Sequence, residues 1–359
     1  MTDTREQQIW AALLEAGAVK GDMPEHKIPD SPWYVKVLLG FSGWLAAIFI
    51  LGFIGVGFDF IFKDKSLAAL VGIAMIGGAF ILLRISKNEF VEHLGLAASL
   101  AGQALLVYAM FEFAGHKDIL AVWILLTLLQ IILVVLMPNY VHRVFSSFIA
   151  AIAFSMAFTE IKMPYWGSGI VMFIAAICWL KEFKYPVHME KIRAAGYGFT
   201  MALILLKGVA LFGSRIFGYH LSEKESEFWT YPWFGEIIIG VVTIYVVWSL
   251  LKRYGCILQE RTTLVFLIAA ILLCVVSLKV QGITVGIVIM ILGFSASNRV
   301  LLGLGIVSLL FYISTYYYLL DITLLHKSLI LLVAGLVLLT LRWFMLRLIP
   351  IHEEVHHAE

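Results

Sequence analysis

Charged residues are scarce in this sequence, and their scarcity excludes the soluble protein classes. Asp, Glu, Lys and Arg make up 14% of the 359 residues, whereas hydrophobic residues make up 62%. A soluble protein carries about 25% charged residues. The formal net charge is only +2 and the basic residues are spread thinly along the chain, without a basic cluster for nucleic acid. We therefore predict that this chain lies in a lipid bilayer and does not bind nucleic acid.

Cysteines and catalytic motifs are equally scarce. The three cysteines, Cys178, Cys256 and Cys274, are scattered and have no metal-ligand spacing, so they predict neither a disulfide framework nor a metal site. The sequence contains no P-loop, nucleotide-binding fingerprint, serine elbow or pair of catalytic carboxylates. It therefore predicts a protein that is not an enzyme and that holds no cofactor.

One motif runs against this prediction. Residues 352–356 read His-Glu-Glu-Val-His and match H-E-x-x-H, in which two histidines one helical turn apart bind zinc. A protease site also needs a third ligand and a shaped cleft. The motif follows Pro350, and only residues 357–359 lie beyond it. We interpret the match as accidental in a tail rich in His and Glu.

Long apolar runs fill most of the chain and predict an all-α fold, a polytopic bundle of transmembrane helices. We expect about twelve spans joined by short connections into antiparallel hairpins. Their predicted cores are residues 35–58, 66–84, 94–114, 119–137, 144–160, 165–180, 194–213, 234–251, 263–278, 282–295, 300–320 and 328–348. A short cytoplasmic amphipathic segment (1–33) precedes the transmembrane domain (34–349), and a cytoplasmic His- and Glu-rich tail (350–359) follows it.

Short matches between these runs indicate internal repeats. Lys36-Val-Leu-Leu-Gly40 is echoed by Arg299-Val-Leu-Leu-Gly303, and Phe148-Ile-Ala-Ala-Ile152 by Leu267-Ile-Ala-Ala-Ile271. Duplicated hairpins are common in transporters. Chance is the alternative, because apolar sequence uses few residue types.

Ionisable and polar residues inside the predicted spans are the candidate ligand-binding groups. Lys207 is the clearest of them. Its long stem could carry the ammonium to the membrane interface, or the group could act inside the bundle. Glu112 lies near the end of a span, beside the interface, and Gln103 is able to form hydrogen bonds between helices.

Two glycines and one loop complete the candidate sites. Gly169 and Gly286 lie in short, glycine-interrupted spans, which are typical of transporter sites but also of closely packed helices. The predicted outer loop 214–233 combines acidic and aromatic residues and is a candidate partner or lid segment through Glu223, Glu225, Trp229 and Trp233. A plain interfacial anchor is the alternative for this loop.

Several stretches resemble a known family. They are Ser31-Pro-Trp-Tyr34, Gly43-Trp-Leu-Ala-Ala47, Asn298-Arg-Val-Leu-Leu-Gly303, Tyr316-Tyr-Tyr318 and Lys327-Ser-Leu329. The family is an uncharacterised group of polytopic bacterial inner-membrane proteins, a domain of unknown function often encoded beside a smaller membrane protein with a GDYxxLxY motif. The resemblance implies an inner-membrane location and a possible small membrane-protein partner. It implies no catalytic residues.

Two functions remain open at this point. The absence of catalytic chemistry favours a non-enzymatic subunit of a membrane complex. The repeats, Lys207 and the broken spans favour a secondary transporter or a permease for lipids or small molecules. A polar cavity near the middle of the membrane would favour the transporter, and a solid interior would favour the subunit.

The distribution of Lys and Arg predicts that both termini are cytoplasmic. Green fluorescent protein fused after residue 359 should fluoresce, and alkaline phosphatase inserted in loop 214–233 should be active. If residues 263–295 formed one long helix, the C-terminus would lie outside, and phosphatase fused there would be active instead.

Overall fold

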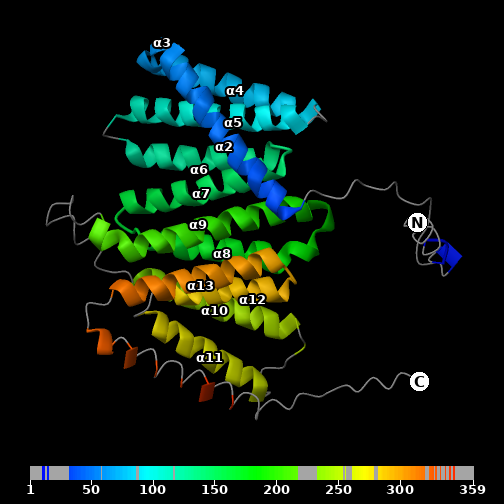
Figure 1. Ribbon diagram of the computed structural model, residues 1–359, viewed down its shortest axis with the longest axis vertical. Coiled ribbons are helices and arrows are strands. Elements are labelled where there is room, and N and C mark those ends of the chain that lie inside the picture. Colours follow the sequence, from blue (N-terminus) through cyan, green and yellow to red (C-terminus); the bar gives the residue numbers. More distant parts are fainter. Residues whose placement is uncertain are drawn as a thin grey trace.

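The computed structural model describes seven main ranges of the chain. They are residues 32–57, 59–85, 89–115, 118–216, 233–253, 261–278 and 282–319, together with Gly255 and scattered residues of 10–15 and 323–343. Every regular element in these ranges is a helix, which confirms the all-α prediction. The labels below are those of Figure 1.

Eleven long helices and three short ones make up this described part. The long helices are α2 (Trp33–Gly57), α4 (Lys65–Ile85), α5 (Glu89–Ala114), α6 (Ile119–Leu136), α7 (Tyr140–Glu160), α8 (Trp166–Lys181), α9 (Met189–Ile216), α10 (Trp233–Arg253), α11 (Arg261–Ser277), α12 (Ile283–Ser295) and α13 (Arg299–Leu319). The short ones are α3 (Asp59–Lys63) and the 3-10 turns η1 (Glu182–Lys184) and η2 (Pro186–His188).

Eight helices of the described part are long and apolar enough to cross a membrane, as a multi-pass membrane protein requires. They coincide with α4 to α10 and α13. The helices α11 and α12, at 17 and 13 residues, are shorter. The last predicted span, 328–348, lies almost wholly outside the described residues, so the count of about twelve is not confirmed.

The helices run back and forth side by side in an elongated stack (Figure 1). Helices α4 and α5 form one end of the stack, and α6, α7 and the α8–α9 pair follow, whereas α10 and α11 lie at the other end. The helix α2 crosses α5 obliquely instead of joining the stack. Consecutive helices run in opposite directions, as the short connections predict.

The turn between α6 and α7 illustrates how the sequence sets the helix ends. Pro138 disfavours helical backbone in the residue before it, and Met137 is extended there (φ −65°, ψ 131°). Asn139 then caps α7 by accepting a hydrogen bond from the His142 N–H at 3.0 Å. The chain therefore reverses within three residues.

Small residues allow α7 to lie between its neighbours. Its buried positions are mostly Ser and Ala, including Ser146, Ser147, Ala150, Ala151 and Ala153. On the facing helix α9, a Cβ added at Gly198 would lie 2.6 Å from the Ser147 Cβ and would also collide with the Val144 carbonyl oxygen. Close backbone approach of this kind is typical of helix pairs in membranes, where van der Waals contact drives association.

Large apolar side chains cover the outside of the stack. On α6, for example, Leu125, Leu128 and Ile132 are each 52% exposed. A soluble protein of this kind would present a very large apolar patch to water. In a bilayer the same face contacts lipid.

The predicted spans 263–278 and 282–295 correspond to two separate helices, α11 and α12. Gly282, immediately ahead of α12, has a positive φ of +91° that a residue with a side chain rarely adopts. The predicted duplication remains a prediction, and the corresponding helices α8 and α12 differ in length, at 16 and 13 residues.

We expect Gly198→Ala to lower the free energy of unfolding by about 1–3 kcal/mol, because the added methyl group overpacks the α7–α9 contact. Gly303→Ala is the matched control, since no atom lies within 4 Å of its added Cβ. Thermal unfolding of both variants in lipid nanodiscs checks this expectation. Equal stability of the two variants would contradict it.

Candidate functional site

The candidate site consists of three polar side chains on three consecutive helices. Lys207 lies in the apolar stretch Leu205-Leu-Lys-Gly-Val209 of α9, Glu236 is the fourth residue of α10, and Ser277 is the last residue of α11. We call these three residues the polar triad. Hydropathy favours each of these helices in a membrane, and the three side chains meet between them.

The triad has the geometry of a fully formed ion pair. The Lys207 Nζ donates to Glu236 Oε1 at 2.6 Å, and the Ser277 Oγ donates to Glu236 Oε2 at 2.8 Å. The side chains of Lys207 and Glu236 are 1% and 0% exposed. Both carboxylate oxygens therefore have a donor, and the ammonium has an anionic acceptor.

This geometry decides between the two alternatives left open for Lys207. A snorkelling lysine would reach the membrane interface, but Lys207 is buried and paired inside the protein. Removing an ammonium and a carboxylate from water is costly, and only close mutual pairing offsets that cost. Lys207 is thus an internal residue.

Glu236 is the functional residue that the sequence analysis missed. It lies at the start of the predicted span 234–251, where an acidic residue is ordinarily interfacial. The available signal was an acid within the stretch Trp233-Phe-Gly-Glu-Ile-Ile-Ile239, opposite a lysine one helix earlier. Only the approach of α9 and α10 joins the two charges.

Tyr312 of α13 lies next to the triad along α9. Its hydroxyl donates to the Ile204 carbonyl at 3.0 Å, less than one turn from Lys207. Its ring covers Gly282, where an added Cβ would come within 2.8 Å of the ring. The residue itself is 0% exposed. Tyr312 therefore covers the α13 side of this region with a buried ring.

A second buried polar group, the His142 cluster, joins α5, α6 and α7. It consists of Ser99, Gln103, Gln130, His142 and Ser146, all buried. The His142 Nε2 lies 2.7 Å from the Ser99 Oγ and 3.1 Å from the Gln103 Nε2, and the Gln130 Nε2 donates to Gln103 Oε1 at 2.8 Å. Gln103 thus does what the sequence predicted and bonds between helices. It does not join the triad.

The two candidate glycines make close helix contacts. A Cβ at Gly169 would lie 2.6 Å from the Ile238 Cγ2, and one at Gly286 would lie 3.0 Å from the Leu309 Cα. These neighbours occupy the space that a ligand would need. Such contacts are typical of closely packed helices, which was the alternative to a transporter site at these glycines.

Of the remaining candidates, the structure describes Glu112 and Trp233. Glu112 is exposed near the end of α5, and its backbone carbonyl accepts a hydrogen bond from Lys65 at 3.5 Å. Trp233 begins α10 and stacks on Phe234 with ring centroids 4.0 Å apart. Glu223, Glu225 and Trp229 lie outside the described residues, as does the C-terminal His-Glu motif.

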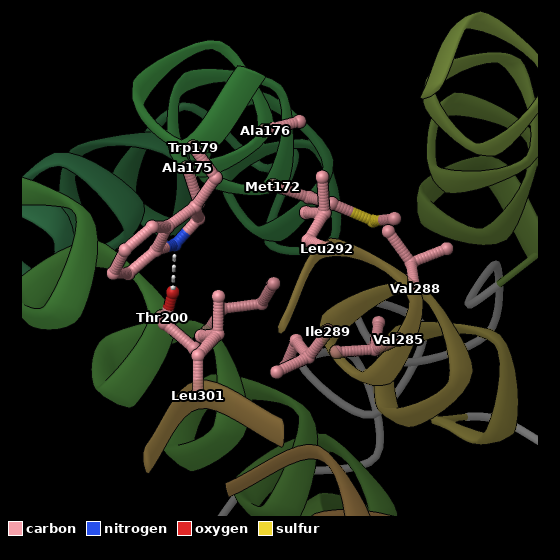
Figure 2. A pocket seen from close by; sticks show the side chains of 11 residues that line it. Met172, Ala175, Ala176, Trp179, Thr200, Val285, Val288, Ile289, Leu292 and Leu301 are labelled. Atoms are coloured by element: carbon pink, nitrogen blue, oxygen red, sulfur yellow. Dashed lines mark hydrogen bonds between the residues drawn. The ribbon is translucent and has the colours of Figure 1, made fainter. Parts of the chain in front are cut away.

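The space between α8, α9, α12 and α13 is nearly filled (Figure 2). A cavity there measures about 10 Å³ and is lined mainly by apolar side chains such as Met172, Val288 and Leu292. A cavity needs about 10–15 Å³ to hold one water molecule. Its one polar contact, the Trp179 Nε1 donating to the Thr200 Oγ1 at 3.0 Å, is already satisfied.

The described residues contain no group of three or more His, Cys, Asp or Glu side chains that could hold a metal ion. The triad itself offers an ammonium, a carboxylate and a hydroxyl that are joined by hydrogen bonds.

One family model covers most of this chain. It matches residues 32–348 and is described as a domain of unknown function, DUF4401. The chain belongs to this family. No curated protein and no solved structure matches the chain significantly. Membership of DUF4401 confirms the resemblance to an uncharacterised family and adds no named activity.

In this DUF4401 protein we expect each single loss of charge in the triad to be more damaging than the double loss. Lys207→Met or Glu236→Leu leaves one buried charge unpaired and should cost about 3–5 kcal/mol of unfolding free energy. The double variant Lys207→Met/Glu236→Leu removes both charges, so most of that loss should be recovered. Unfolding in lipid nanodiscs measures all three.

The exposed Glu112→Gln is the control, and it should change stability by less than about 0.5 kcal/mol. Additive losses in the double variant would show that the two side chains do not act as a pair.

Proposed function

We propose that this DUF4401 protein is a non-enzymatic subunit of a membrane complex in a bacterial inner membrane, with both termini cytoplasmic. The observation that carries the proposal is the filled interior of α7 to α13. Helices there approach so closely that a side chain larger than glycine would collide with the neighbouring helix, as at Gly198, Gly286 and Gly293. A rigid helical body of this kind suits a subunit that holds a partner in place.

The buried polar groups support the same proposal. In the triad and the His142 cluster, side chains bond mainly to one another, so they are committed to holding helices together. A ligand site generally keeps polar groups directed into a cavity. The cavity between α8, α9, α12 and α13 has apolar walls and about 10 Å³ of space.

The proposed partner is a small membrane protein. The resemblance noted from the sequence implies a neighbour-encoded protein with a GDYxxLxY motif, which this chain lacks. The lipid-facing side chains of α2 and α6 give ample apolar surface for a transmembrane helix. No site for such a helix is assigned here.

A secondary transporter is the second candidate, and one observation favours it. Ionisable residues inside a membrane protein mark ion and substrate pathways by default, and Lys207 and Glu236 are such residues. A filled interior is what a transporter would have in a closed state. The pair would then lie between two access routes.

Native mass spectrometry of the protein, extracted gently from its own membrane with lipids retained, tests the proposal. We expect a protein partner in fixed stoichiometry with the chain. An unrelated multi-pass protein purified in the same way is the control for carried-over contaminants. A lone chain with a defined small molecule or lipid bound would overturn the subunit proposal and favour the transporter.

A further inference from the structure

We propose that Glu236 is a proton-binding site, and that a proton bound there releases Lys207 and loosens the junction of α9, α10 and α11. This inference goes beyond the proposed function, because it concerns the contact between α9, α10 and α11 and holds with or without a partner protein. It rests on the arrangement of donors and acceptors around one carboxylate.

The present contacts are those of an ionised Glu236. Its two oxygens accept from two donors, the Lys207 Nζ at 2.6 Å and the Ser277 Oγ at 2.8 Å. An ammonium has no acceptor capacity, so Lys207 cannot serve a protonated acid as a hydrogen-bond acceptor. A hydroxyl both donates and accepts.

Ser277 is therefore suited to both states of the site. When a proton binds to Oε2, the new O–H donates to the Ser277 Oγ, and that hydrogen bond is kept with its direction reversed. Lys207 keeps its own proton but loses its anionic partner. The triad as a whole gains one positive charge, and the only covalent bond formed is the O–H of the acid, while the contact between the Lys207 ammonium and the Oε1 oxygen loses its charge attraction.

The released ammonium is the source of the movement. With the neutral acid beside it, Lys207 is a buried charge without a counter-charge, which is strongly unfavourable in an apolar interior. Its long stem allows the ammonium to move toward water if the ends of α9 and α10 separate. Protonation thus loosens the contact between the ends of α9 and α10.

The site lies close to the ends of two helices. Glu236 is three residues after Trp233, the first residue of α10, or about 4.5 Å along the helix. Ser277 ends α11. Trp233 is 41% exposed, so this end of α10 reaches the surface of the bundle.

The surrounding helices bring few other titratable groups to the triad. Cys274 of α11 and Tyr312 of α13 are within electrostatic reach of Glu236, and the Tyr165 backbone from the start of α8 contacts Gly235. The helix α12 has no titratable residue, and the charged end residue of α7, Glu160, is exposed. None of these supplies a second carboxylate to replace Glu236.

Infrared difference spectroscopy of the full chain in lipid nanodiscs tests the proton site. We expect the carbonyl stretch of a protonated carboxylic acid to grow as the pH is lowered, and this band to be lost in Glu236→Gln. Glu112→Gln, at an exposed carboxylate, is the matched control and should keep it. If Glu236→Gln does not fold, Glu236→Asp should shift the frequency of the band.

A second variant separates a proton site from a fixed ion pair. Without the neighbouring positive charge the neutral acid is favoured, so Lys207→Met should show the band at a pH where the wild type lacks it. After correction for the intrinsic rate of amide exchange, which falls in acid, the amides at the start of α10 should be less protected at low pH, and in Glu236→Gln at every pH, since Gln mimics the neutral acid.

Three results would overturn the proposal. They are a wild-type band that does not change over the range in which the protein stays folded, a band that persists in Glu236→Gln, and protection of the amides at the start of α10 that is independent of pH and of this substitution. Loss of a protein partner in mass spectrometry affects none of these readouts.

Discussion

Polar groups inside a membrane protein have no water to bind, and the structure of this protein depends on how it meets that constraint. A charged side chain in the interior must find its counterpart on another helix. The ion pair between Lys207 and Glu236 is the strongest case, with a 2.6 Å contact and almost no exposure. This side-chain contact links α9 to α10.

The same constraint operates elsewhere in the bundle with neutral groups. The His142 cluster joins α5, α6 and α7, and the Trp179–Thr200 hydrogen bond joins α8 and α9. Tyr197 of α9 donates to Asn298, just ahead of α13, at 2.8 Å. Apolar contact alone does not distinguish a neighbouring helix from lipid, so these polar contacts and the close glycine crossings specify which helices meet.

One molecule can combine a rigid, closely packed interior with a polar triad that responds to a proton. Most buried side chains of α7 and α8 carry no charge, such as Ser, Ala and Trp. The triad differs, because one proton alters its balance of charges.

Several features could be predicted from the sequence, because hydropathy and turn chemistry are local. The helices from α4 to α10 fall within a few residues of the predicted spans, and Pro138-Asn139 marks a turn that the structure contains. Lys207 was recognisable as unusual in its own apolar stretch. Gln103 was recognisable as a polar side chain available to another helix.

The sequence by itself determined that the chain is helical, apolar and suited to a membrane, since these properties depend on composition and on the length of each run. Only the tertiary structure decided what Lys207 does. Its partner Glu236 lies 29 residues away at the start of another helix. The third residue of the triad, Ser277, lies a further 41 residues along the chain. No local pattern encodes which helices approach, because that depends on the fit of whole helix surfaces, and the chemistry of the triad exists only where those surfaces meet.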